Sequence, residues 1–154
     1  MTDTAIVEVR RATQADHASL TRLYAGFFAE DGISVPEDRI AQNLAQMMAD
    51  TRAAVFVARV SDKVIGLAAG SKTFGVEFGW AVEFEDLYVH PDHRGQGVSH
   101  RLVAAVTAWA DAQDAAIVEL VITAEAEADQ GLTRFYARHG FVQSDRVIMH
   151  RFSR

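Results

Sequence analysis

Residues 83–99 read EFEDLYVHPDHRGQGVS, a β-strand pattern that passes through a short loop into the start of an amphipathic helix. Gly95 and Gly97 stand at that helix start, where backbone N–H groups lack carbonyl partners and the peptide dipoles favour negative charge. Glycine lets such amides approach a ligand because no Cβ intervenes. The stretch therefore predicts an anion site, typically for phosphate, with the positive charge of Arg94 beside it. The plainer alternative is that the two glycines only shape a turn.

Other chemical motifs fit this stretch poorly. The Rossmann fingerprint needs a third glycine where this chain has His100, and a Walker lysine after the glycines is missing. His90 and His93 have a spacing found at metal sites, but no third ligand of clear geometry accompanies them, so we expect no metal. The Gly-x-Ser-x-Gly elbow of serine acyl-enzyme hydrolases is also absent from the sequence.

Strand and helix patterns surround this stretch. Thr13 and Asp16 predict a capping box at a helix start, and Gly140 predicts a helix C-cap. The expected strands are 6–9, 54–60, 64–73, 80–89, 116–123 and 146–152. The expected helices are 13–30, 36–48, 99–111 and 130–139. Residues 1–154 are therefore predicted to form one mixed α+β domain.

Composition excludes several classes of protein. The chain has 154 residues, of which 49% are hydrophobic, and these values are typical of a single globular domain. Its 15 basic and 21 acidic residues give a net charge of −6, which disfavours nucleic-acid binding. Cysteine is absent, which excludes disulfides and a cysteine nucleophile and fits a cytoplasmic protein. We expect no signal peptide and no membrane span.

The stretch resembles the acetyl-CoA signature of the GNAT N-acetyltransferases, which reads Gln or Arg, two variable residues, Gly, one variable residue, then Gly or Ala. RGQGVS at residues 94–99 follows a strand exit typical of the family, LYVHP at 87–91. FYARHGF at 135–141 is similar to the family's second motif, aromatic-Tyr-x-x-x-Gly-Phe. The resemblance covers roughly residues 6–152. It implies the GNAT fold, a central mixed, mostly antiparallel sheet flanked by about four helices.

The resemblance also implies acetyl-CoA as co-substrate. Backbone groups at 87–89 would hold the pantetheine and acetyl group, with the Val89 N–H polarising the carbonyl, while amides at 95–99 would hold the pyrophosphate. Two positions depart from the family: Ser99 replaces Gly or Ala, and Asp129 replaces a common Asn. The expected cofactor residues are Leu87, Tyr88, Val89, Arg94, Gly95, Gln96, Gly97, Val98, Ser99, His100 and Asp129.

Three residues are candidates for proton transfer. By resemblance, Tyr136 is the donor to the departing thiolate, and its ordinary pKa of about 10 keeps it protonated at neutral pH. Glu83 matches the position of a glutamate base in several members, and Glu85, two residues on, would share its side of a regular strand. The alternatives are a core role for Tyr136 and two solvated strand carboxylates.

The expected function is acetyl transfer to a primary amine by direct attack in a ternary complex. The acceptor is a small molecule or a peptide, and the aromatic and acidic residues at 24–38 and 74–80 suit a cation with apolar surface. The alternative is a non-catalytic acyl-CoA-binding module, which the departures at Ser99 and Asp129 favour. A homodimer is an expectation at the level of the family.

Overall fold

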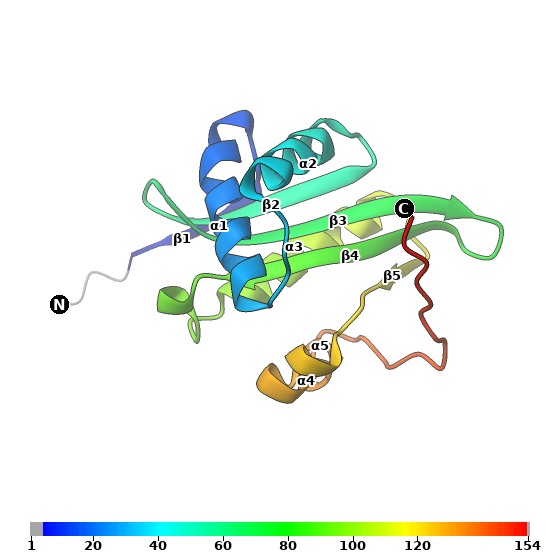
Figure 1. The fold of residues 1–154 in the computed structure, drawn as a ribbon. Helices are drawn as coiled ribbons and strands as arrows, with labels where there is room; N and C mark the ends of the chain where they lie inside the picture. Colours follow the sequence, from blue (N-terminus) through cyan, green and yellow to red (C-terminus); the bar gives the residue numbers. More distant parts are fainter. Residues whose placement is uncertain (1–4, 154) are drawn as a thin grey trace. The chain divides into compact units, whose positions relative to one another are not determined.

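The computed structural model describes residues 5–153. These residues form two compact units that divide between Val121 and Ile122. Figure 1 shows the elements of the first unit. They are β1 (Val7–Arg11), α1 (His17–Glu30), α2 (Glu37–Ala49), β2 (Ala53–Val60), β3 (Lys63–Gly75), β4 (Gly79–Val89), α3 (Val98–Ala112) and β5 (Ile117–Glu119), with short 3₁₀ turns at Gln14–Asp16 and Pro91–His93.

The strands make one mixed sheet in the order β1-β2-β3-β4-β5. The first four strands are antiparallel, and β5 runs parallel to β4. The β4–β5 pairing covers only Ala81 to Glu83 of β4, opposite Ile117 to Glu119. Within the described chain, the rest of β4 up to Val89 therefore has no strand partner on that side. This open edge positions the candidate site.

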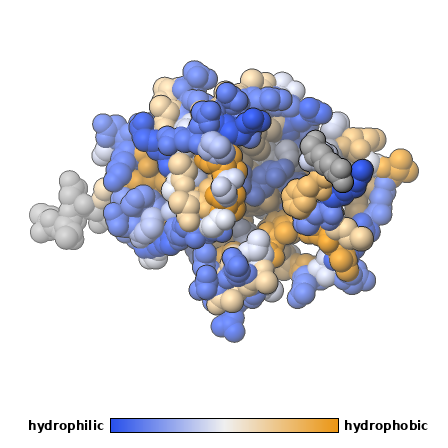
Figure 2. Space-filling model, in the orientation of Figure 1, coloured by the Kyte–Doolittle hydropathy of each residue, from blue (hydrophilic) through white to orange (hydrophobic). Residues whose placement is uncertain are grey.

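Helices cover both faces of the sheet (Figure 1). The core under α1 and α2 contains Leu20, Leu23, Tyr24, Ile40, Leu44, Val55, Val57, Leu67, Ala69 and Tyr88. On the other face α3 lies close to β3 because that strand carries glycines there. A Cβ on Gly66 would lie 3.1 Å from Leu102 Cδ1, and one on Gly70 would lie 3.3 Å from Trp109 and Val106. Figure 2 shows a mostly hydrophilic outer surface over α1 and α2, as expected of helices that bury their apolar side.

The second unit contains α4 (Ala124–Gln130) and α5 (Leu132–Ala137). The predicted helix at 130–139 was therefore wrong at its start. The Thr123 hydroxyl accepts from the Ala126 amide and begins a helix at 124, and Gly131, with φ of +60°, separates the two short helices.

Two predicted strands also differ. The strand expected at 116–123 forms only over Ile117–Glu119. The strand expected at 146–152 was wrong, because no described residue from 138 to 153 lies in a helix or strand. Val147, Met149 and Phe152 there are more than four-fifths exposed, so their apolar side chains gain none of the packing that stabilises a strand.

The predicted fold class, α+β with a central mixed and mostly antiparallel sheet, is confirmed. The described residues contain five α-helices rather than about four, because Gly131 divides the last one. None of the helices between residues 5 and 153 combines the length and the apolar character needed to cross a bilayer.

Candidate active site

The stretch predicted to bind an anion lies at the N-terminus of α3. Gly95 and Gly97 have φ of +75° and +79°, in the left-handed region that glycine adopts without strain, and Gly97 is the N-cap residue. A Cβ at either glycine would meet nothing within 4 Å, so open space lies beside both. Among residues 5–153, no group accepts a hydrogen bond from the amides of 95–99. These amides are available for a phosphate group.

Arg94 does not stand as an isolated charge beside this site. Its Nε donates to the Val89 carbonyl at 2.9 Å, and its Nη2 lies 2.9 Å from the Glu30 carboxylate at the end of α1. The Tyr88 hydroxyl donates to the same carboxylate at 2.7 Å. Burial acts to raise the pKa of Glu30, but the hydrogen bonds from Tyr88 and Arg94 outweigh it, so the pKa of Glu30 is lowered. Arg94 therefore ties the loop after β4 to α1, and Glu30 compensates much of its charge.

The end of β4 presents free backbone donors along its open edge. The His90 amide donates to the Ile65 carbonyl at 2.8 Å, and Gly66 pairs with Val89 in the register. Because antiparallel neighbours alternate in the direction of their N–H groups, the amides of Leu87 and Val89 face away from β3. They face the side on which β5 has ended. The amide of Val89, the expected donor to the acyl group, and the amide of Leu87 therefore both face this open edge.

A β-bulge interrupts β4 at the predicted acids. The register pairs Ala69 with Asp86 and Gly70 with Phe84, so Glu85 is the extra residue. The regular alternation of side chains between the two faces of the strand, from which Glu83 and Glu85 were predicted to share a side, is therefore interrupted at this segment. The bulge brings Glu85 and Asp86 to the wall of one pocket.

Glu83 and Glu85 nevertheless lie near each other. Ser71, the register partner of Glu83, donates its hydroxyl to Glu85 Oε1 at 2.6 Å. Partial desolvation of the largely exposed Glu83 raises its pKa, and the negative charges of Glu85 and Glu119 add to that rise.

The pocket has a volume of about 450 Å³ and is formed by α2, the start of β2, and strands β3 and β4. Three of its side chains are carboxylates, from Asp50, Glu85 and Asp86. The other lining residues are Asn43, Gln46, Met47, Ala53 and Ser71. This lining suits a ligand that carries positive charge and hydrogen-bond donors.

Sequence reasoning missed Asp86. The Tyr24 hydroxyl on α1 donates to Asp86 Oδ2 at 2.9 Å. Burial raises the pKa of Asp86 to about 6, the hydrogen bond from Tyr24 opposes the rise, and the charge of Glu85 adds to it. The signal in the sequence was a carboxylate directly before the apolar end of a strand.

The aromatic residues expected to face an acceptor mostly pack on one another. Phe27 stacks on Tyr88 with ring centroids 4.9 Å apart, and Tyr24 meets Phe28 edge-on at 5.6 Å. Tyr24 is buried, and Glu30 is paired with Arg94. The acids that line the pocket come instead from β4 and the turn after α2.

Two candidate residues belong to the second unit. Tyr136 on α5 is buried, and its ring centroid lies 5.6 Å from that of Phe141. Gly140 has φ of +86°, and the Phe141 amide donates to the Tyr136 carbonyl at 3.2 Å, so the predicted helix C-cap is confirmed. Asp129 is exposed on α4.

Comparisons with known proteins agree with this geometry. A sequence model of the acetyltransferase (GNAT) family matches residues 17–141. An aminoglycoside N(6′)-acetyltransferase type 1 from Stenotrophomonas maltophilia is 32% identical, over 93% of this chain and 91% of that protein.

Solved structures share the fold. An aminoglycoside N-acetyltransferase in complex with CoA superposes with a TM-score of 0.83 at 20% identity, covering 99% of this chain and 98% of the other. A possible acetyltransferase from Clostridium difficile 630 gives a TM-score of 0.83 at 16% identity, covering 96% and 98%.

Proposed function

Because this chain belongs to the GNAT acetyltransferase family and is an acetyl-CoA-dependent N-acetyltransferase, we propose that it acetylates a primary amine of a small polycationic acceptor of the aminoglycoside type. Transfer is direct, in a ternary complex. The observation that carries the proposal is the pocket lined by Glu85 and Asp86, which have no cationic partner among residues 5–153, and by Asp50, which is paired with Arg52. A ligand with several ammonium groups matches that lining better than a neutral or singly charged one. The relative that is named as an aminoglycoside acetyltransferase supports the same acceptor class.

The residues at the helix start and the open strand edge fit acetyl-CoA. Amides from 95 to 99 would hold the pyrophosphate, and the space beside Gly95 and Gly97 leaves room for it. Acetyl-CoA supplies a thioester whose acyl carbon is the electrophile. The N–H of Val89 would donate to the acyl oxygen, where negative charge develops during attack, and the N–H of Leu87 would remain for the pantetheine arm.

Proton transfer completes the reaction. Glu83 and Glu85 attract the acceptor's ammonium group, and a carboxylate of β4 accepts its proton, directly or through water. Tyr136 gives a proton to the departing thiolate, the role that its motif implies. Ser99 is small enough to leave the approach to the α3 amides open.

A matched pair of amino sugars tests the acceptor. Neamine carries a 6′-amine, and paromamine has a hydroxyl at that position but is otherwise the same. We expect acetyl-CoA-dependent thiol release with neamine, lower kcat/KM with glucosamine, which has a single amine, and a product mass that places one acetyl group on neamine. Loss of thiol release with paromamine would place the acetyl group on the 6′-amine, and release equal to that with neamine would place it on one of the amines that the two compounds share. Equal kcat/KM for glucosamine and neamine would contradict a polycationic acceptor.

Glu85→Gln gives the same test from the side of the protein. Losing one charge-assisted contact raises KM for neamine by roughly tenfold or more and KM for glucosamine by less. Asp62→Asn is the matched control, because it removes a carboxylate from the β2–β3 turn, away from the pocket lining. Equal changes in Glu85→Gln and Asp62→Asn would point to net charge rather than to the pocket.

We also propose that the enzyme acts in the cytoplasm, which the cysteine-free sequence favours, and that it binds no nucleic acid, because its net charge is −6. The alternative of a non-catalytic acyl-CoA-binding module is not retained. A relative that is 32% identical over most of both chains is named as an enzyme.

A further inference from the structure

We propose that Asp86, oriented by the Tyr24 hydroxyl, is the general base that takes the proton from the acceptor's ammonium group, in preference to Glu83 and Glu85. The inference rests on the proposed function, since it concerns the amine-acetylating step at the same pocket.

Position along β4 favours Asp86. It lines the pocket and directly precedes Leu87, whose amide faces the open edge. At about 3.3 Å per residue, Asp86 lies about 10 Å along the strand from Val89, and Glu83 lies about 20 Å away. An amine held by Asp86 is therefore nearer than one held by Glu83 to the acyl group that the Val89 amide polarises.

Hydrogen bonding also distinguishes the three carboxylates. Tyr24, only 5% exposed, donates to Asp86 Oδ2 and fixes the plane of that carboxylate. Within residues 5–153, Asp86 Oδ1 has no hydrogen-bond partner, so it is left for an acceptor's ammonium group. Glu85 is exposed and accepts a hydrogen bond from the Ser71 hydroxyl. Glu83 is exposed too, and it lies at the end of the β4–β5 pairing. Asp86 alone is both partly buried and held by a buried donor.

The charges around Asp86 support its role as a base. The titratable groups that act on it are Tyr24 from α1 and Glu85 from β4, and the same pocket is lined by Asp50, whose carboxylate is paired with Arg52. Asn43 and Gln46 from α2 are neutral. A carboxylate with a pKa of about 6 is mostly ionised at neutral pH and is a stronger base than an ordinary aspartate. Burial and Asp86 raise the pKa of Tyr24 well above its usual value, so Tyr24 stays a donor.

Atoms and charges balance in the proposed step. The ammonium group gives one proton to Asp86 Oδ1, and the freed nitrogen lone pair forms the C–N bond to the acyl carbon. The C–S bond breaks with its electron pair on sulfur. Tyr136 gives its proton to the thiolate, and the second nitrogen proton replaces it on Tyr136. Asp86 then releases its proton to water. The net products are the amide, CoA thiol and one proton.

Rate–pH profiles of matched variants test the assignment. Asp86→Asn keeps the shape of the side chain and an oxygen that accepts from Tyr24, so we expect folding and CoA affinity to persist. The value of kcat/KM should fall at least about 100-fold. The acid limb of the profile, which is the fall of kcat/KM below about pH 6, should disappear. Tyr24→Phe removes the hydrogen bond that stabilises and orients the carboxylate, so the limb should move to higher pH and the plateau of kcat/KM above it should fall. A role in packing alone would not move the limb. Asp62→Asn is the control.

Glu83→Gln and Glu85→Gln are the competing variants. Both should keep the acid limb, although Glu85→Gln changes KM. Loss of the limb in either of them, or its persistence in Asp86→Asn, would overturn the proposal.

Carbon-13 NMR of the aspartate carboxyl groups in the free protein gives a readout apart from activity. The Asp86 signal should titrate near pH 6 and move upward in Tyr24→Phe, and a midpoint near 4 would reject the proposal. If the enzyme acetylates glucosamine but no polycation, the acceptor proposal alone fails. The profiles are then measured with glucosamine and still decide the role of Asp86.

Discussion

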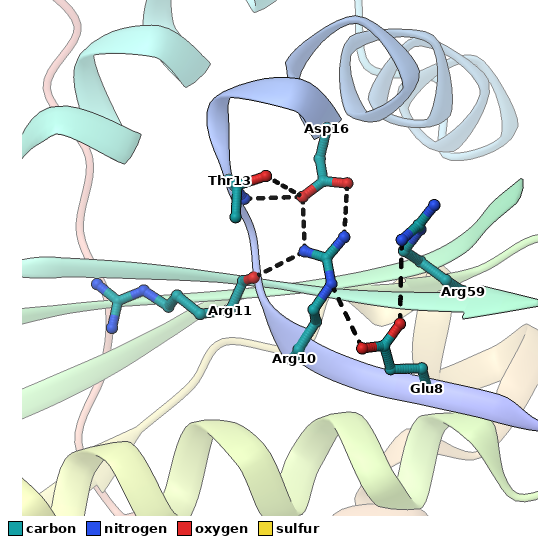
Figure 3. Close-up of polar contacts among 6 residues, drawn as sticks. All are labelled: Glu8, Arg10, Arg11, Thr13, Asp16 and Arg59. Carbon is teal, nitrogen blue, oxygen red and sulfur yellow. Dashed lines mark hydrogen bonds and ion pairs between the residues drawn. The ribbon is translucent and has the colours of Figure 1, made fainter. Parts of the chain in front are cut away.

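Asp16 is a buried carboxylate that joins β1 to α1 (Figure 3). It accepts two hydrogen bonds from the Arg10 guanidinium, at 2.8 and 3.1 Å, and one from the Thr13 amide at 2.7 Å. The acidic half of the capping box predicted from Thr13 and Asp16 is therefore confirmed. Figure 3 also shows Glu8 between Arg10 and Arg59, which continues the charge network along β1 and β2. Pairing makes burial of the Asp16 charge tolerable.

This pairing predicts how stability depends on pH. Hydrogen bonds from Arg10 lower the pKa of Asp16 from 3.8 to about 2, so the carboxylate stabilises the fold fully above about pH 4 and loses that contribution as pH falls toward 2. Asp16→Asn should cost about 2 kcal/mol of unfolding free energy at pH 7, measured by urea denaturation, and the difference should narrow as pH approaches 2.

Asp50→Asn is the matched control for Asp16→Asn. Arg52 lowers the pKa of Asp50 to about 2 as well, but that pair lies at the surface, so little stability should be lost. A difference between Asp16→Asn and the parent that stays constant from pH 7 to 2 would show that the ion pair is not its source.

At the scale of elements, the start of α3 depends on backbone conformation rather than on side chains. Gly97 caps the helix with φ of +79° and makes no side-chain cap. The last residues of β4 set the direction in which the loop leaves, and Arg94 ties that loop to Val89 and Glu30. The helix therefore begins with its amides exposed.

Gly97→Ala tests this helix start. The left-handed conformation costs a non-glycine residue roughly 1–2 kcal/mol, so we expect a lower Tm and, by calorimetry, weaker CoA binding. Gly26→Ala in the interior of α1 is the control, because a Cβ there meets nothing within 4 Å and alanine should stabilise the helix by about 0.5–1 kcal/mol. Unchanged CoA affinity in Gly97→Ala would argue against a phosphate site at this helix start.

At the scale of the whole molecule, the chain combines two units. The family match over residues 17–141 crosses their boundary, and we propose that residues 1–154 act as one catalytic domain. The donors on β4 belong to the first unit, and Tyr136 belongs to the second.

Tyr136→Phe tests the contribution of the second unit. It removes the proposed proton donor to the thiolate but keeps the ring that packs near Phe141. We expect kcat to fall about 100-fold, while CoA affinity by calorimetry and Tm stay close to the parent values. A parent-like kcat would remove Tyr136 from the mechanism, and a large drop in Tm would assign it a packing role.

The sequence by itself determined the order of most elements, the glycine-bearing start of α3 and the family, because these depend on local periodicity, caps and short motifs. Tertiary structure decided the chemistry around them. The bulge at Glu85 placed Asp86 in the pocket wall, and alternation predicts a face only while a strand stays regular. Tyr24 meets Asp86 across 62 positions of the chain, and Arg94 meets Glu30 across 64. Such partners depend on how α1 packs on the sheet, and no local pattern encodes that packing.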